Sequence, residues 1–296
     1  MNVCKVMANS LTSKPRPKSK TVNTRAFFIG ITLVLCGAAS SARTLFIDFN
    51  NAESEIAVFK QTSQGVASEV VVVPSYTRIP RKQRLIVVKA NAKIEKYTEL
   101  VQDCAVAVNR DKKCDTYYDR IREAEQEREK ATGGYTAKDL EAELKALMAD
   151  TKSPPFNMVV ISGHHELGFY RGELTDAKVQ EFIDMMDGSR KLYDNVNTVV
   201  FLGCDTGTKE VYQNTLTDMF PHVPVILASE DKAPTRNEAR NLAYIKQVMT
   251  IRPKLLSAKS VREVQPLFQS LLSKQWPASL LWKQNFVFFK DSTELL

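Results

Sequence analysis

Two polar segments that each follow an apolar run contain the side chains best suited to chemistry. One run ends just before His164 and His165, and the other ends just before Cys204. The thiolate is the attacking form of cysteine, and a nearby imidazole lowers the pKa of the thiol or protonates the leaving group. If both runs are neighbouring strands, the strands lie about 4.8 Å apart. Side chains just beyond their ends can then approach within hydrogen-bonding range. This spacing predicts nucleophilic catalysis by Cys204, with an imidazole managing the proton.

The elements that must position these residues follow one another regularly from residue 156 onward. Apolar runs rich in Val and Ile alternate with helical patterns, and the first two runs begin about 40 residues apart. Continuous Val/Ile runs are typical of strands covered on both faces, and this alternation is typical of parallel βαβ units. We therefore expect an α/β fold with a doubly wound, mostly parallel sheet, whose ligands lie off the carboxyl ends of the strands. The expected strands are 156–162, 196–202 and 223–228, and the expected helices are 175–186, 209–220 and 235–250.

The N-terminal half has a different pattern. Residues 43–115 are predicted to be a β-rich region, and 116–155 a charged helical region that ends in a proline linker before the α/β domain 156–296. Thr136, with Asp139 three residues later, resembles a weakened capping box, which marks the start of the second helix of this region. The basic cluster Arg81-Lys82-Arg84 is expected to be a turn in water. The expected strands are 45–49, 56–59, 70–73 and 85–88.

Charge is concentrated at the N-terminus. Residues 1–42 contain six basic residues and no acidic residue, and they leave 35 basic and 34 acidic residues in the rest of the chain. The nearly neutral remainder gives no reason to expect nucleic acid as a partner.

The same N-terminal segment has the pattern of a secretory signal. A basic stretch precedes the apolar run 26–39, and small residues follow up to Ala42. The run is shorter than the roughly 20 residues needed to span a bilayer, so no permanent membrane anchor is expected. We predict a signal peptide over 1–42, cleavage near Ala42, and export to a periplasm or the exterior. An uncleaved anchor and lipidation at Cys36 remain alternatives.

Three cysteines follow the predicted cleavage point. Cys104 and Cys114 flank a short polar loop, and in an oxidising compartment a disulfide between them would stabilise the fold by roughly 2–3 kcal/mol. The alternative is two unrelated reduced thiols. If the two cysteines pair, Cys204 is left as the odd thiol, and such a thiol is a candidate for reactivity.

The two strand-end motifs resemble the caspase-like family, which includes caspases, metacaspases, gingipains and separase. In that family one strand ends in a His-Gly element, and the next ends in the nucleophilic cysteine. The resemblance covers about residues 156–250, and it implies that His164 is the catalytic histidine and Cys204 the nucleophile. It also implies that the backbone amides of Gly163 and Cys204 bind the oxyanion. Because His165 stands where the family has glycine, His165 remains the alternative catalytic histidine.

The resemblance further implies a primary specificity pocket and a protein or peptide substrate. Asp205, Glu230 and Asp231 follow expected strands, and together they would form an acidic pocket suited to Lys or Arg. No cofactor is expected. A zinc site at the two histidines is not expected either, because adjacent residues of an extended segment point to opposite faces.

The leading hypothesis is an exported caspase-like cysteine endopeptidase. One alternative is a non-catalytic secreted or envelope protein that uses a caspase-like scaffold to bind a partner. Another is an acyl or thioester hydrolase that uses the same two side chains.

Overall fold

The computed structural model describes most of the chain from residue 42 onward, so residues 1–41 of the predicted signal peptide lie outside the described residues. Residues 39–296 form one compact unit, so strands on either side of the proline linker belong together. The described residues are 42–61, 68–106, 112–166, 168–203, 206–207, 215–229, 239–268, 270, 286–290 and 294–295.

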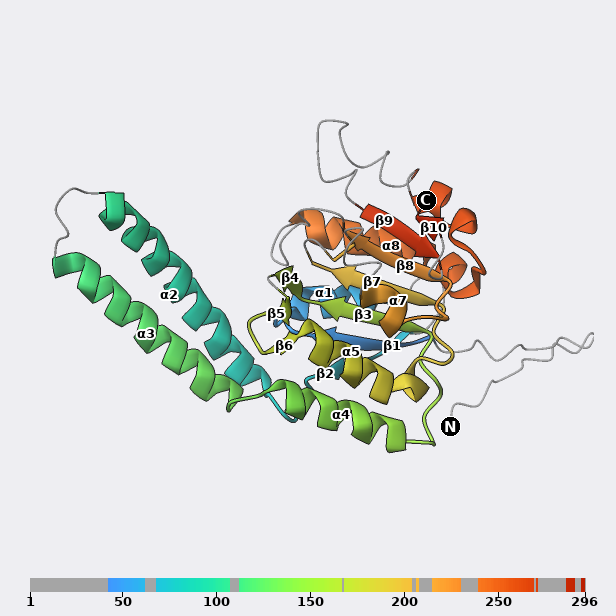
Figure 1. Cartoon of the computed structure of the whole chain (residues 1–296), viewed down its shortest axis with the longest axis horizontal. Helices are drawn as coiled ribbons and strands as arrows, with labels where there is room; N and C mark the ends of the chain where they lie inside the picture. Colours follow the sequence, from blue (N-terminus) through green and yellow to red (C-terminus); the bar gives the residue numbers. More distant parts are fainter. Residues whose placement is uncertain are drawn as a thin grey trace, which may run out of the picture. The chain divides into compact units, whose positions relative to one another are not determined.

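A mostly parallel sheet organises this unit, in the strand order β10-β9-β8-β7-β3-β1-β2 (Figure 1). The neighbouring strands β8, β7, β3, β1 and β2 are parallel to one another. β9 is antiparallel to β8, and β10 is antiparallel to β9. Their bounds are β1 Ala42–Asp48, β2 Ser68–Val73, β3 Met158–Ser162, β7 Thr198–Leu202, β8 Val225–Ser229, β9 Phe286–Lys290 and β10 Glu294–Leu295. The predicted α/β class and mostly parallel sheet are confirmed.

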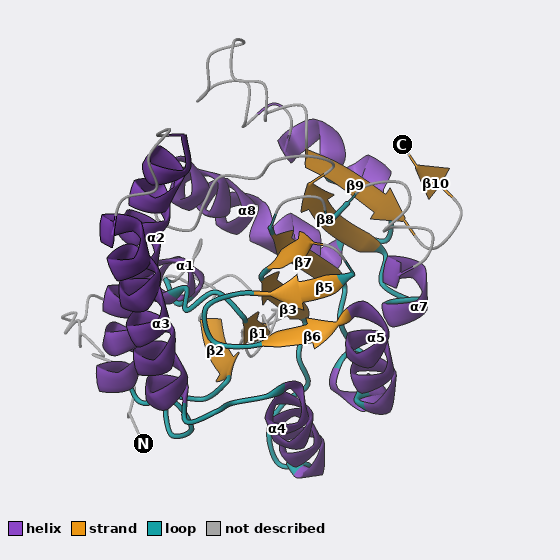
Figure 2. Cartoon of the chain, turned by 60° about the vertical axis from the view of Figure 1, so that its left-hand side comes forward, coloured by secondary structure: helices purple, strands orange, loops and turns teal. Residues whose placement is uncertain are grey.

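Helices cover both faces of the sheet, and alternate strand residues reach the two layers (Figures 1 and 2). In β3, Val159 and Ile161 belong to one apolar cluster, while Met158 and Val160 belong to the other. The first cluster includes residues of α4 (Ala137–Ala149), α5 (Val179–Gly188) and the short α7 (Thr217–Met219). The second includes residues of α1 (Glu53–Phe59), α8 (Ala239–Ser257) and the 3₁₀ turn η3 (Val261–Glu263). Burial on both faces explains why these strands are apolar without alternation.

Three short antiparallel strands follow β3 and form a second sheet in the order β4-β5-β6. They are β4 His164–Glu166, β5 Phe169–Arg171 and β6 Asp176–Lys178. The expected helix 175–186 therefore starts later than predicted, as α5, because residues 176–178 pair with β5. The 3₁₀ turn η1 (Arg190–Leu192) then leads toward β7.

The segment between β2 and β3 contains two long helices that lie side by side, α2 (Arg81–Val106) and α3 (Lys112–Thr132) (Figures 1 and 2). Cys104 and Cys114 form the predicted disulfide between them, with Cα atoms 6.0 Å apart. After Gly133 and Gly134, which have positive φ, the Asp139 carboxylate accepts hydrogen bonds from the Thr136 backbone amide (3.0 Å) and hydroxyl (2.8 Å) at the start of α4.

Two predicted strands of the N-terminal half are wrong, because residues 56–59 belong to α1 and residues 85–88 to α2. In α2, Val87 and Ala90 are buried, while Leu85 and Val88 are 54% and 41% exposed. Burial at a spacing of three is helical, and a four-residue apolar run cannot reveal that period. The described residues of region 43–115 are therefore not a β-rich segment of their own, since their strands β1 and β2 lie in the main sheet and α1 and most of α2 fill much of the rest.

Candidate functional site

The candidate site begins where β3 and β7 end side by side. The two strands are parallel neighbours, with Ser162 opposite Leu202. A Cβ atom added at Gly203 would overlap the carbonyl oxygen of Gly163 and would lie 3.4 Å from the Cα atom of His164. Only glycine fits Gly203 at this contact, so the two strand ends remain in direct contact one residue before Cys204.

The two histidines occupy different surroundings on β4. His164 lies opposite Arg171 of β5, and His165 lies opposite Tyr170. Because neighbouring strand residues point to opposite faces, the two imidazoles diverge. The His165 ring packs against the Tyr170 ring with centroids 5.4 Å apart, and Tyr170 is buried 4.9 Å from the Phe182 ring. His165 therefore borders the aromatic core, and His164 lies on the other face of the small sheet.

Burial also acts on the tyrosine that supports His165. Within the described residues the Tyr170 hydroxyl has no hydrogen-bond partner, and burial raises the pKa of this phenol above its usual value. Tyr170 is thus a neutral aromatic support for His165 at ordinary pH.

A hydroxyl group anchors the segment after Cys204. The Thr206 side chain is buried and donates to the carbonyl oxygen of Gly203 at 3.1 Å. The same hydroxyl oxygen accepts from the Ser229 backbone N–H at 3.4 Å, and the Gly207 N–H donates to the Ser229 carbonyl at 2.7 Å. The chain on both sides of Cys204 is therefore fixed to the ends of β7 and β8.

Buried polar side chains line the same end of the sheet. Glu55 of α1 accepts a hydrogen bond from the Ser162 hydroxyl at 2.7 Å and another from the Asn241 amide. Asn50, just after β1, donates to the Ser162 oxygen at 3.4 Å. All four side chains are buried, with Glu55 only 1% exposed. Hydrogen bonds of this kind are what makes burial of a carboxylate tolerable.

A buried ion pair lies beside this cluster, at the end of β1. Arg84 donates to the Asp48 carboxylate at 2.7 Å and to the carbonyl oxygens of Pro74 (2.6 Å) and Ile79 (3.2 Å). Asp48 also accepts from the Ala52 N–H at 3.0 Å, just before α1. The expectation that Arg84 lies in water is wrong, because its side chain is 1% exposed.

Several predicted site residues fall outside the described part of the chain. They are Cys204, Asp205, Glu230 and Asp231. Gly163, His164 and His165 are described and lie at the end of β3 and in β4. The nucleophile, the oxyanion amide of Cys204 and the acidic specificity pocket therefore stay predictions.

Comparisons with known proteins assign no family to the chain. No family model and no curated protein matches it. One solved structure that is similar is described as a secreted C11 cysteine protease from Bacteroides thetaiotaomicron in complex with an irreversible peptide inhibitor. The identity is 10% and the TM-score 0.35, and the match covers 53% of this chain and 45% of the other. Similarity at this level transfers no activity.

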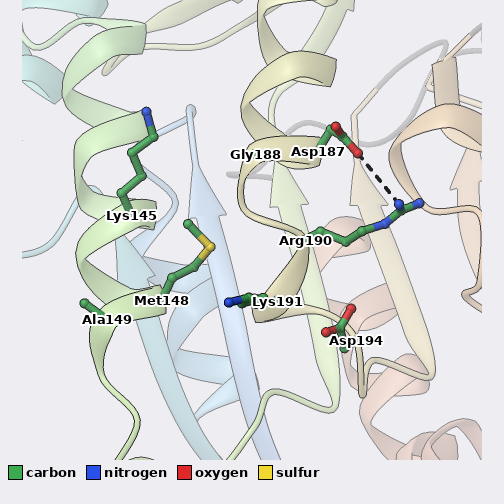
Figure 3. Close-up of a pocket in the computed structure, with 8 residues that line it drawn as sticks. All are labelled: Lys145, Met148, Ala149, Asp187, Gly188, Arg190, Lys191 and Asp194. Carbon is green, nitrogen blue, oxygen red and sulfur yellow. Dashed lines mark ion pairs between the residues drawn. The ribbon is translucent and has the colours of Figure 1, made fainter.

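Two hollows of similar size border the described residues. The first, about 640 Å³, lies between the C-terminal ends of α4 and α5, toward the N-terminal end of the sheet (Figure 3). It is lined by Lys145, Met148, Ala149, Asp187, Gly188, Arg190, Lys191 and Asp194. The second, about 670 Å³, lies between the turn that joins α3 to α4 and the turn that joins β5 to β6, and Arg171 borders it. Only the second adjoins the strand that pairs with His164.

The described residues contain no group of three or more His, Cys, Asp or Glu side chains arranged to hold a metal ion. Within the same part of the chain, no helix is long and apolar enough to cross a membrane.

Sequence reasoning missed the buried acids and Arg84. Glu55 and Ser162 are 107 residues apart, and Glu55 and Asn241 are 186 apart, so no local motif announces the cluster.

Proposed function

We propose that the chain is an exported cysteine peptidase of caspase-like architecture, with Cys204 as nucleophile and His164 as general acid and base. The observation that carries this proposal is the register of β3 against β7, with Ser162 opposite Leu202 and Gly203 against Gly163. His164 and Cys204 directly follow these two glycines in the sequence. Because consecutive Cα atoms lie about 3.8 Å apart, we expect Cys204 to lie close to His164.

The proposed reaction needs only the chain's own groups and water. The Cys204 thiolate attacks the scissile carbonyl carbon, a C–S bond forms, and the C–N bond breaks as imidazolium donates a proton to the leaving amine. Water, deprotonated by the imidazole, then hydrolyses the thioester and regenerates the thiol. The backbone amides of Gly163 and Cys204 would stabilise the oxyanion. Asp205, Glu230 and Asp231 would favour a basic side chain, and the hollow beside β5 offers room for the substrate chain.

Of the two histidines, His164 suits this role better. His165 packs edge to face on Tyr170, while His164 directly follows Gly163, which contacts the residue before Cys204. A catalytic imidazole must reach the thiol within about 3.2 Å or through one water.

The deciding experiment is alkylation of the purified chain from residue 43 by iodoacetamide between pH 4 and 9, with the modified cysteine located by mass spectrometry. We expect Cys204 to react well below the free-thiol pKa of about 8.5. His164→Ala should abolish this shift, and His165→Ala should preserve it. Ordinary reactivity of Cys204 in all three proteins would contradict the peptidase proposal.

A non-catalytic binding protein is the second candidate, and the helical pair α2–α3 favours it. This pair exposes Leu85, Val88 and Tyr118, which are 54%, 41% and 43% exposed. Inert Cys204, together with capture of a partner that fails when Leu85 and Val88 are replaced by Ser, would support this reading.

Export is part of the proposal and has its own test. β1 begins at Ala42, so cleavage near that residue would leave the rest of the first strand in the mature chain. Mass spectrometry of the exported product should give the mass of a chain whose first residue lies near Arg43.

A further inference from the structure

We propose that Glu55 is a positioning residue for the His164–Cys204 pair, because it anchors the end of β3 through the Ser162 hydroxyl. This inference rests on the proposed function. Glu55 is 1% exposed, and its two carboxylate oxygens accept from different elements, Ser162 of β3 at 2.7 Å and Asn241 of α8.

Burial of the Glu55 carboxylate is costly. Glu55 lies on α1 between the strand ends and an apolar layer that includes Ile56 and Phe59. Taking a carboxylate out of water costs several kcal/mol unless hydrogen bonds replace the lost hydration. An apolar residue would pack there at lower cost, so the carboxylate must contribute something besides packing.

Ser162 connects Glu55 to the segment that contains His164. It is the last residue of β3 and lies two residues before His164, the first residue of β4. Its hydroxyl donates to Glu55 and accepts from Asn50, so the strand end is held from two sides. Rotation or lateral shift of this strand end would move His164 with it.

Asn241 is the second partner of the carboxylate. It lies in the first turn of α8, which follows the segment that contains Glu230 and Asp231. One carboxylate therefore ties the strand that leads to His164 to the helix that follows the predicted specificity acids. Glu55 acts through these residues and is not a group that touches the substrate.

The test uses the full mature chain and the pH profile of Cys204 alkylation. Glu55→Gln keeps the shape but presents an amide N–H₂ to one of the two donors, which disrupts the anchor. We expect the midpoint pH of alkylation to rise by about 1, so that the rate at pH 6 falls about tenfold. Glu55→Asp, which keeps the charge, should restore part of the rate.

Glu53→Gln is the matched control, because Glu53 lies on the same helix but is exposed and pairs with Arg81 at 3.4 Å. Its alkylation profile should equal that of the wild type. If Glu55→Gln does not fold, Ser162→Ala removes only one hydroxyl and should raise the midpoint in the same direction.

The outcomes separate the two proposals. If the wild type shows the shift, His164→Ala abolishes it, and a folded Glu55→Gln or Ser162→Ala keeps the wild-type profile, the positioning role is overturned while the peptidase stands. A purely structural Glu55 would give this result, with lower stability and an unchanged profile. If the wild-type Cys204 shows no shift, both proposals fail together.

Discussion

The buried polar cluster at the C-terminal end of the main sheet and the hollow between α4 and α5 differ in how their polar side chains are held. At the C-terminal end, Glu55, Asp48 and Arg84 are buried, and hydrogen bonds such as Arg84 to Asp48 at 2.7 Å fix them. In the hollow between α4 and α5, charged residues line an open space, and the ion pair there, Arg190 to Asp187, spans 4.0 Å between exposed side chains (Figure 3).

This difference separates the size of a hollow from the precision of a site. The hollow between α4 and α5 and the hollow beside β5 have volumes of about 640 and 670 Å³, so volume does not distinguish them. A buried polar group is costly unless its partners are placed accurately, whereas an exposed ion pair gains little and tolerates movement. Groups fixed in this way at the carboxyl ends of parallel strands are better pointers to function than volume.

The largest expected effect is at the buried ion pair. Arg84→Met removes a guanidinium that contacts Asp48 and two backbone carbonyls, and should lower the free energy of unfolding by about 3–5 kcal/mol. Urea denaturation followed by circular dichroism measures this loss. A loss below about 1 kcal/mol would show that the buried Arg84–Asp48 pair contributes no more than the exposed Arg190–Asp187 pair.

A glycine in each region provides a sharper comparison of intermediate size. Gly203→Ala should cost about 1–3 kcal/mol, because the new methyl group would overlap the carbonyl of Gly163. Gly188→Ala, at the end of α5, meets nothing within 4 Å and should instead stabilise by about 0.5–1 kcal/mol. Thermal melting of both variants measures whether each change raises or lowers stability. A change in the same direction in both variants would contradict the expected difference.

The smallest effect is expected at the exposed pair. Arg190→Ala should change stability by less than about 1 kcal/mol, because Arg190 and Asp187 are 46% and 67% exposed. Its Cys204 alkylation profile should match the wild type. Altered alkylation in this variant would mean that the two regions are coupled.

The sequence was informative where burial is complete and local. The Val/Ile runs predicted β3, β7 and β8. The run at 85–88 misled because four apolar residues fit a strand, while the neighbouring residues of α2 decide the helical period. Tertiary packing, which places Val87 in the core, settled the question.

The site was predictable to the extent that it lies at strand ends. The place of His164 just after the end of a strand could be predicted, and β3 and β7 are neighbours whose carboxyl ends meet at one edge. The burial of Glu55 and Arg84 could not be predicted, because in a sequence a buried charged residue on a helix looks the same as a solvated one. Only the partners reveal it, and those of Glu55 lie 107 and 186 residues away.

The insertion between β2 and β3 also has a consequence for how the chain folds. β1 and β3 pair across a long separation, as in the contact of Arg43 with Asn157, 114 residues apart. Closing such a loop costs entropy that grows with the logarithm of its length, and non-local pairing slows folding. The helices α2 and α3 pair locally, so they can form before the sheet and shorten the effective loop. Once α2 and α3 have formed, the segment that contains them thus makes pairing of β1 with β3 faster.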